Sequence, residues 1–110
     1  MSDCVFCGIA KGSIPSKLVY EDDEILVFYD IHPAATVHYL IIPRRHIESL
    51  DQCEPSDAAL LGRMLLAGKK AAREAGLHDG FRMAIHTGAG GGQVVFHLHM
   101  HVMGEPVAAS

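Results

Sequence analysis

The sequence predicts an α+β domain: an antiparallel sheet of about five strands with one long and one short helix. Three observations predict this class. Short runs rich in β-branched and aromatic residues are separated by connections of hairpin length. One long stretch, 56–75, carries apolar residues at three- and four-residue steps. Helices do not alternate with strands along the chain, which disfavours a doubly wound parallel sheet.

The first elements are a short helix and a hairpin. Residues 4–11 form one or two helical turns that stop at Gly12. The runs 18–21 and 25–29 are rich in Val, Leu, Tyr and Phe and flank the acidic turn 21–24, so they predict a β-hairpin.

The remaining elements follow from changes of period. A third strand covers 37–42 and is closed by Pro43. The long helix spans 56–75, and strands four and five are expected at 81–86 and 94–103, on either side of a glycine-rich loop. The apolar face of the helix holds Leu60, Leu61, Met64, Leu65, Gly68, Ala71, Ala72 and Ala75.

Composition and charge fit one globular domain over residues 1–110. Apolar residues make up 49% and charged residues 20% of the chain, an ordinary globular balance. The net charge of -4 argues against general nucleic-acid binding, which needs a basic face. No apolar run is long enough for a membrane span, and no export signal is visible. We therefore expect a cytoplasmic protein without membrane contact.

The cysteines do not read as a disulfide framework. There are three, an odd number, in a chain without an export signal. The pair Cys4-x-x-Cys7 near the N-terminus therefore calls for another explanation, either a metal site or two buried free thiols.

The most informative stretch is the run of alternating histidines at 97–101. Alternate side chains of a strand point the same way, so His97, His99 and His101 share one face at spacings of about 6.6 Å. The other face is apolar and holds Phe96, Leu98, Met100 and Val102. Three interpretations remain from this pattern: a solvent-facing strand, a metal site, or nucleophilic catalysis by one imidazole.

The run His97-Leu98-His99-Met100-His101-Val102-Met103 resembles the signature of the histidine triad (HIT) family. The similarity covers about residues 3–105 and is greatest to the Hint branch, the purine nucleoside phosphoramidases. It rests on further segments: Ile14-Pro15, Tyr20-Glu21-Asp22-Asp23, Asp30-Ile31, 38–43, Leu61-Gly62-Arg63, 80–83 and Gly91-Gly92-Gln93. The resemblance implies a single HIT-like domain.

This resemblance also implies an activity: hydrolysis of purine nucleoside 5′-phosphoramidates and related acyl-adenylates to the nucleoside monophosphate. It maps the nucleophile to His99, with His101 on phosphoryl oxygen and His97 completing the catalytic triad. The intermediate would be a nucleotidyl-histidine, and catalysis would need no cofactor. Nucleotide contacts are implied for Asp30, Ile31, His86, Gly92, Gln93, Val94, His99 and His101.

A structural zinc and a partner subunit are implied as well. Some bacterial relatives bind zinc through positions that correspond to Cys4, Cys7, His46 and His97, a normal closed tetrahedral set. A homodimer is expected, in which the long helix with Gly68 and a strand edge meet across a two-fold axis.

Three positions depart from the Hint pattern. His86 replaces an asparagine, Val94 a polar residue, and His32 a small polar residue; these changes put the leaving group and rate in doubt. His38 and His78 read as structural or surface residues. Two other functions stay open: dinucleoside polyphosphate hydrolysis, and nucleotide binding for regulation with little turnover.

Overall fold

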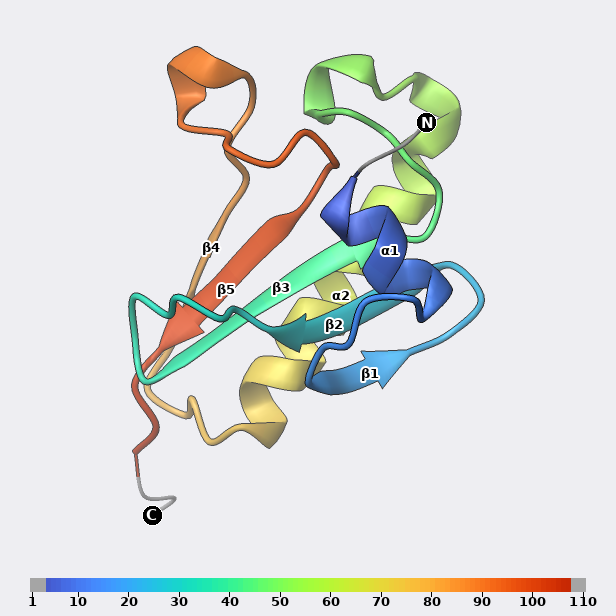
Figure 1. The fold of residues 1–110 in the computed structure, drawn as a ribbon. Coiled ribbons are helices and arrows are strands. Elements are labelled where there is room, and N and C mark those ends of the chain that lie inside the picture. Colours follow the sequence, from blue (N-terminus) through green and yellow to red (C-terminus); the bar gives the residue numbers. More distant parts are fainter. Residues whose placement is uncertain (1–3, 108–110) are drawn as a thin grey trace.

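The structure, a computed structural model, describes residues 4–107 and confirms the predicted α+β class. A five-stranded sheet runs in the order β1-β2-β3-β5-β4, and every neighbouring pair is antiparallel (Figure 1). The strands are β1 (Leu18–Glu21), β2 (Ile25–Tyr29), β3 (Val37–Pro43), β4 (Arg82–Ala84) and β5 (Met100–Gly104). Neither of its helices, as far as the described residues go, is long and apolar enough to cross a membrane.

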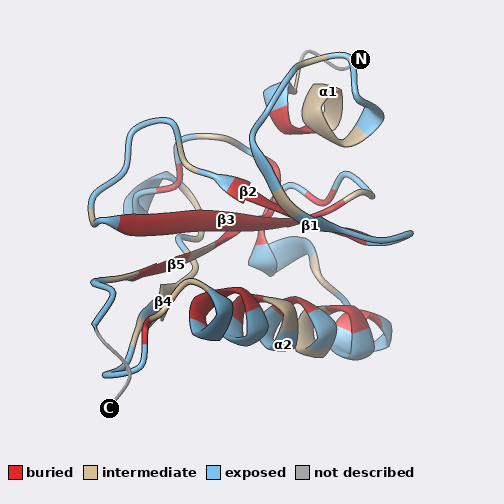
Figure 2. Ribbon diagram, turned by 90° about the horizontal axis from the view of Figure 1, so that it is seen from below, coloured by how far each residue is buried: buried red, intermediate tan, exposed pale blue. Residues whose placement is uncertain are grey.

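Two helices cover opposite faces of this sheet (Figure 2). Helix α1 (Val5–Lys11) ends at Gly12, whose φ of 83° is a left-handed conformation that favours glycine. Helix α2 (Ala58–Glu74) follows a 3₁₀ turn, Pro55–Asp57, so it starts later than the predicted Ser56. The turn is closed by Asp57, whose Oδ2 accepts the Glu54 N–H.

The sheet separates two apolar clusters. On the α2 side, the buried core is built around Met64 of α2, Ile41 of β3 and Val102 of β5. On the α1 side, a smaller cluster joins Phe6 of α1 to Phe28 and Leu40. Strand β3 is buried along its whole length because it is central and covered on both faces.

The prediction of a fifth strand from 94 was wrong. The ladder between β3 and β5 ends at the pair Ile41 and Met100, and the chain bends at 95–97. Beyond that pair the backbone forms hydrogen bonds outside the sheet. The Leu98 N–H, for example, donates to the Ile47 carbonyl. Only His101 of the triad therefore lies inside a strand.

Candidate active site

A cavity of about 550 Å³ opens on the α1 side of the sheet. This volume lies within the range of small-molecule sites, about 300–1,000 Å³. Apolar side chains from α1, β2 and β3 line part of it, among them Phe6, Ile9 and Phe28. The segment that leads into β5 supplies His99, and β5 itself supplies His101. The cavity thus joins an apolar wall to imidazoles.

His99 is held with one ring nitrogen directed at the backbone. Its Nδ1–H donates to the His97 carbonyl oxygen over 2.8 Å, because a carbonyl can only accept. Nε2 therefore carries the lone pair, and it has no hydrogen-bond partner among residues 4–107. The side chain is 7% exposed, and its ring packs edge-on against Phe6 at 5.1 Å.

Burial keeps this imidazole uncharged. Loss of hydration lowers the pKa of His99 below the ordinary histidine value, and the nearby His86 lowers it further. The hydrogen bond to the His97 carbonyl and the charge of Asp30 act in the opposite direction. A neutral ring with its lone pair fixed on Nε2 is a nucleophile that needs no prior deprotonation.

His101 is oriented by His38, which comes from β3. The Ala34 N–H donates to His38 Nδ1 over 2.9 Å, so the proton of the His38 ring sits on Nε2. His38 Nε2 lies 2.9 Å from His101 Nδ1. Because His38 Nε2 carries the proton, His101 Nδ1 must be the acceptor of this hydrogen bond. We had expected His38 to be a structural or surface residue; the structure brings it to the site.

The tautomer of His101 follows from this chain of hydrogen bonds. Burial, with smaller effects of neighbouring histidines, lowers the pKa of His101 to about 4, so the ring is neutral at pH 7. With Nδ1 accepting, its one proton sits on Nε2, a buried atom without a partner in the described part of the chain. His101 therefore presents an unused N–H donor.

Seven of the eight predicted nucleotide contacts line the cavity: Asp30, Ile31, His86, Gly92, Val94, His99 and His101. Gln93 does not. Its side chain is buried, with Oε1 accepting from the Gly88 N–H and Nε2 donating to the carbonyls of Glu48 and Val95. These three hydrogen bonds fix the Gln93 side chain within the loop.

The loop amides are also occupied. The N–H groups of Gly91 and Gln93 donate to the Gly88 carbonyl, and that of Gly92 to Ala89. These hydrogen bonds close a 3₁₀ turn, Ala89–Gly91, that ends at Gly92 with a φ of 89°. These three amides are therefore satisfied within the loop itself.

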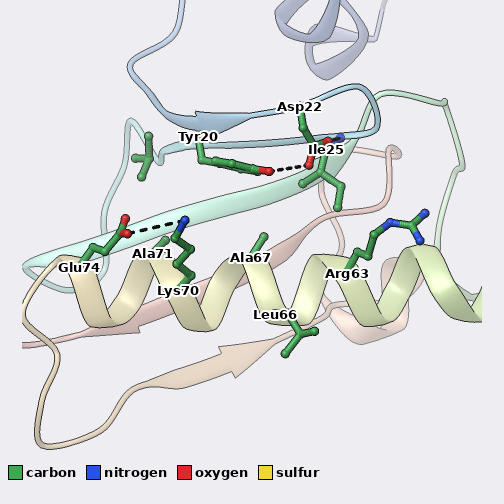
Figure 3. Close-up of a pocket in the computed structure, with 10 residues that line it drawn as sticks. Tyr20, Asp22, Ile25, Arg63, Leu66, Ala67, Lys70, Ala71 and Glu74 are labelled. Atoms are coloured by element: carbon green, nitrogen blue, oxygen red, sulfur yellow. Dashed lines mark hydrogen bonds and ion pairs between the residues drawn. The ribbon is translucent and has the colours of Figure 1, made fainter.

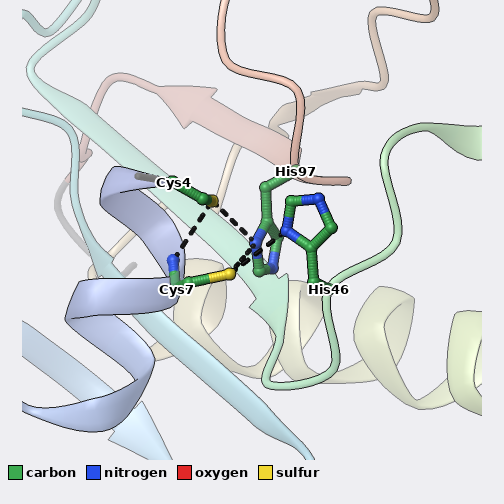
Figure 4. A group of neighbouring side chains, drawn as sticks. All are labelled: Cys4, Cys7, His46 and His97. Carbon is green, nitrogen blue, oxygen red and sulfur yellow. Dashed lines mark hydrogen bonds between the residues drawn. The ribbon is translucent and has the colours of Figure 1, made fainter. Parts of the chain in front are cut away.

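The four predicted metal ligands meet beside α1 (Figure 4). Cys4 Sγ lies 3.2 Å from His97 Nδ1, and Cys7 Sγ lies 3.1 Å from His46 Nδ1. All four ligand atoms are within 4.8 Å of one another, as donors around one ion must be.

His97 fits a metal-binding role by its tautomer. Its Nε2–H donates to the Pro43 carbonyl over 2.8 Å, which leaves the Nδ1 lone pair directed at the thiols. Ring orientation by a backbone carbonyl is the usual support of a metal-bound histidine. Because the His97 carbonyl also accepts from His99, this one residue connects the cysteine cluster to His99.

A second group, Asp30, His38 and His101, also has its ligand atoms within 4.8 Å. Here the hydrogen bonds oppose a metal ion. His38 Nδ1 accepts the Ala34 N–H, so Nε2 keeps its proton and has no lone pair to offer. Asp30 Oδ1 already accepts the His32 N–H at 2.8 Å.

A smaller cavity of about 270 Å³ lies between β1 and α2 (Figure 3). Its rim consists of paired groups: the Tyr20 hydroxyl donates to Asp22, and Lys70 lies 3.9 Å from Glu74. Among residues 4–107, no histidine or cysteine lines it. His99 and His101 line the larger of these two cavities.

Comparisons with known proteins agree with this geometry. Residues 3–110 match a family model described as scavenger mRNA decapping enzyme C-term binding. The protein HitA of Neisseria gonorrhoeae is 51% identical over 107 residues, which cover 97% of this chain and 100% of HitA.

Solved structures are also similar to this chain. The crystal structure of a HIT family hydrolase from Legionella pneumophila superposes with a TM-score of 0.91 at 44% identity, covering 93% of this chain and 92% of that one. A zinc-bound histidine triad family protein from Mycobacterium smegmatis gives a TM-score of 0.82 at 39% identity, covering 94% of this chain and 75% of that one.

Proposed function

The chain belongs to the histidine triad (HIT) family, and we propose that it is a nucleotide hydrolase with His99 as its nucleophile. The substrates are purine nucleoside 5′-phosphoramidates and related acyl-adenylates, and the product is the nucleoside monophosphate. One observation carries the proposal: His99 Nδ1–H is fixed on the His97 carbonyl, which leaves the Nε2 lone pair for phosphorus.

In the first step, His99 Nε2 forms a bond to phosphorus and the phosphorus–nitrogen bond of the substrate breaks. The electron pair of that bond goes to the leaving amine, which takes a proton from solvent. His101 Nε2–H, held in place through His38, donates a hydrogen bond to a phosphoryl oxygen. His97 contributes through its carbonyl, which stabilises the positive ring of the intermediate.

In the second step, water attacks the nucleotidyl-histidine and the electron pair of the breaking bond returns to His99 Nε2. Over both steps, the water delivers its hydroxyl to phosphorus and its other proton, through solvent, to the amine. No cofactor takes part. The apolar wall with Phe6 and Phe28 is suited to a purine. The Asp30 carboxylate, whose Oδ2 lies 3.3 Å from His38 Nε2, has further lone pairs to accept a hydrogen bond from a ribose hydroxyl.

We assign a structural zinc to Cys4, Cys7, His46 and His97. Two thiolates and two imidazoles form a closed tetrahedral set without an open position, so such an ion would stabilise the fold. The set joins α1 to the segment after β3 and to His97 (Figure 4). None of the three cysteines, all in the described residues, forms a disulfide, which is in keeping with a cytoplasmic location.

We also propose a homodimer that pairs through the free edge of β4. The predicted interface needs one correction. Gly68 faces its own sheet, where an added Cβ would lie 2.6 Å from Met83 Cε, so Gly68 is not available to a partner. Leu65, 46% exposed and about 100° further around α2 from Met64, remains on the β4 side of the helix.

Sedimentation at micromolar concentration should therefore give twice the chain mass of 11.9 kDa. Leu65→Lys should shift the protein toward monomer, since a charge would be buried at the interface. Leu66→Lys is the matched control: Leu66 is 63% exposed and lines the smaller cavity on the other side of α2. A wild-type protein that sediments only at 11.9 kDa contradicts the dimer.

The function is tested by rapid-quench trapping with adenosine 5′-phosphoramidate labelled at phosphorus. We expect acid-labile label on His99 within one turnover, and faster turnover of this substrate than of diadenosine polyphosphate. Faster polyphosphate turnover would make the protein a dinucleoside polyphosphate hydrolase. Tight AMP binding without label or turnover would make it a regulatory binding module and overturn the enzymatic proposal.

A further inference from the structure

His86 is the solvent-exposed member of a group of imidazoles around His101. The rings of His38 and His99 lie 5.1 Å from that of His101, and the ring of His86 lies 4.8 Å from it, tilted by 40°. His38 and His99 are buried, whereas His86 is exposed and follows β4 at the cavity rim. His86 is therefore the member of this group that solvent and a ligand at the cavity mouth reach directly.

The cavity otherwise lacks a cation for an anionic ligand. Its lining, taken over residues 4–107, contains no lysine or arginine. The charged or titratable groups near His86 are His101, His99, His38 and the carboxylate of Asp30. The only other exposed histidine of the described lining, His32, sits two residues after Asp30.

The direction of attack sends the leaving group toward the cavity mouth, where the exposed His86 lies. His99 is buried, so a substrate reaches it from the cavity mouth. In-line displacement sends the leaving group away from the nucleophile, and therefore outward. Gly92, which has no side chain, lies beside His86, and the cavity lining on this loop side also includes Val94, which is apolar and 86% exposed.

Building on the proposed function, we propose that His86 in its protonated form binds an oxyanion carried by the leaving group. The preferred substrates are then nucleoside 5′-phosphate derivatives whose leaving group bears a carboxylate or a phosphate. The bonds formed and broken at phosphorus are those given above; His86 contributes a charge-assisted hydrogen bond and no proton transfer.

Two phosphoramidates of adenosine, with glycine and with glycinamide, test this preference because they share one phosphorus–nitrogen bond and differ in the carboxylate. We expect wild-type kcat/KM to favour glycine by about tenfold, and His86→Asn to remove the preference. His78→Asn, which changes an exposed histidine that does not line the cavity, should retain it. A preference unchanged in His86→Asn overturns the inference.

Binding separates this inference from the proposed function. Calorimetry with AMP and α,β-methylene ADP needs no turnover, and the second phosphate should tighten binding to the wild type about tenfold but not to His86→Asn. If both nucleotides bind and their affinity ratio is the same in the variant, the role of His86 is wrong while the function stands. If neither nucleotide binds, the proposed function itself fails.

Discussion

Replacing His99 by alanine is expected to lower turnover of adenosine 5′-phosphoramidate by about 10⁴-fold or more, the scale of nucleophile removal in hydrolases. The variant loses Nε2, the atom that we propose bonds to phosphorus, while the apolar wall and Asp30 remain. AMP should therefore still bind. Single-turnover rates and calorimetric titration with AMP measure the two effects separately.

The matched control is His78→Ala, which removes an exposed imidazole that does not line the cavity. It should retain wild-type turnover. His99→Gly extends the test because it removes the whole side chain. Wild-type rates from the His99→Gly protein would assign the nucleophile to another residue.

Cys7→Ser is expected to reduce bound zinc to less than about a tenth of one ion per chain and to lower the unfolding temperature by about 10 °C. A hydroxyl is a poorer zinc ligand than a thiolate, and an ion bound only by the folded state stabilises it by mass action. Metal analysis and thermal unfolding of the purified protein measure the two quantities.

Cys53→Ser is the appropriate comparison for this variant. Cys53 is a half-buried thiol whose Sγ–H points to the Ser49 carbonyl, outside the cluster around Cys7. Its substitution should leave the zinc content unchanged. Equal unfolding temperatures and zinc contents for the two variants, or less than about a tenth of one zinc in wild type never exposed to a chelator, would refute the metal assignment.

Local periodicity was sufficient to predict most of the fold. Both helices and the first three strands lie within a few residues of their predicted bounds. The alternation in the last segment correctly separated Leu98, Met100 and Val102, which enter the α2-side core, from the imidazoles. Phe96 is an exception, since it precedes the strand and is 45% exposed.

What sequence reasoning missed depends on pairing between distant segments. His38 looked structural because nothing local shows that β3 pairs with β5, which brings His38 to 2.9 Å from His101. The one available signal was a polar residue in an otherwise apolar strand. Gln93 was predicted to contact the nucleotide. Its hydrogen bond to the Glu48 carbonyl joins residues 45 positions apart, so no local pattern of the sequence indicates it.

The larger apolar core and the cavity lie on opposite faces of the sheet, and this separation has an evolutionary consequence. The core around Met64 and Ile41 lies on the face opposite the cavity. Substitutions in this core therefore change thermal stability with little effect on which ligand binds. Substitutions on the opposite side, at an exposed lining position such as Val94, change ligand preference with little loss of stability. Substrate preference and thermal stability are therefore expected to evolve almost independently of each other.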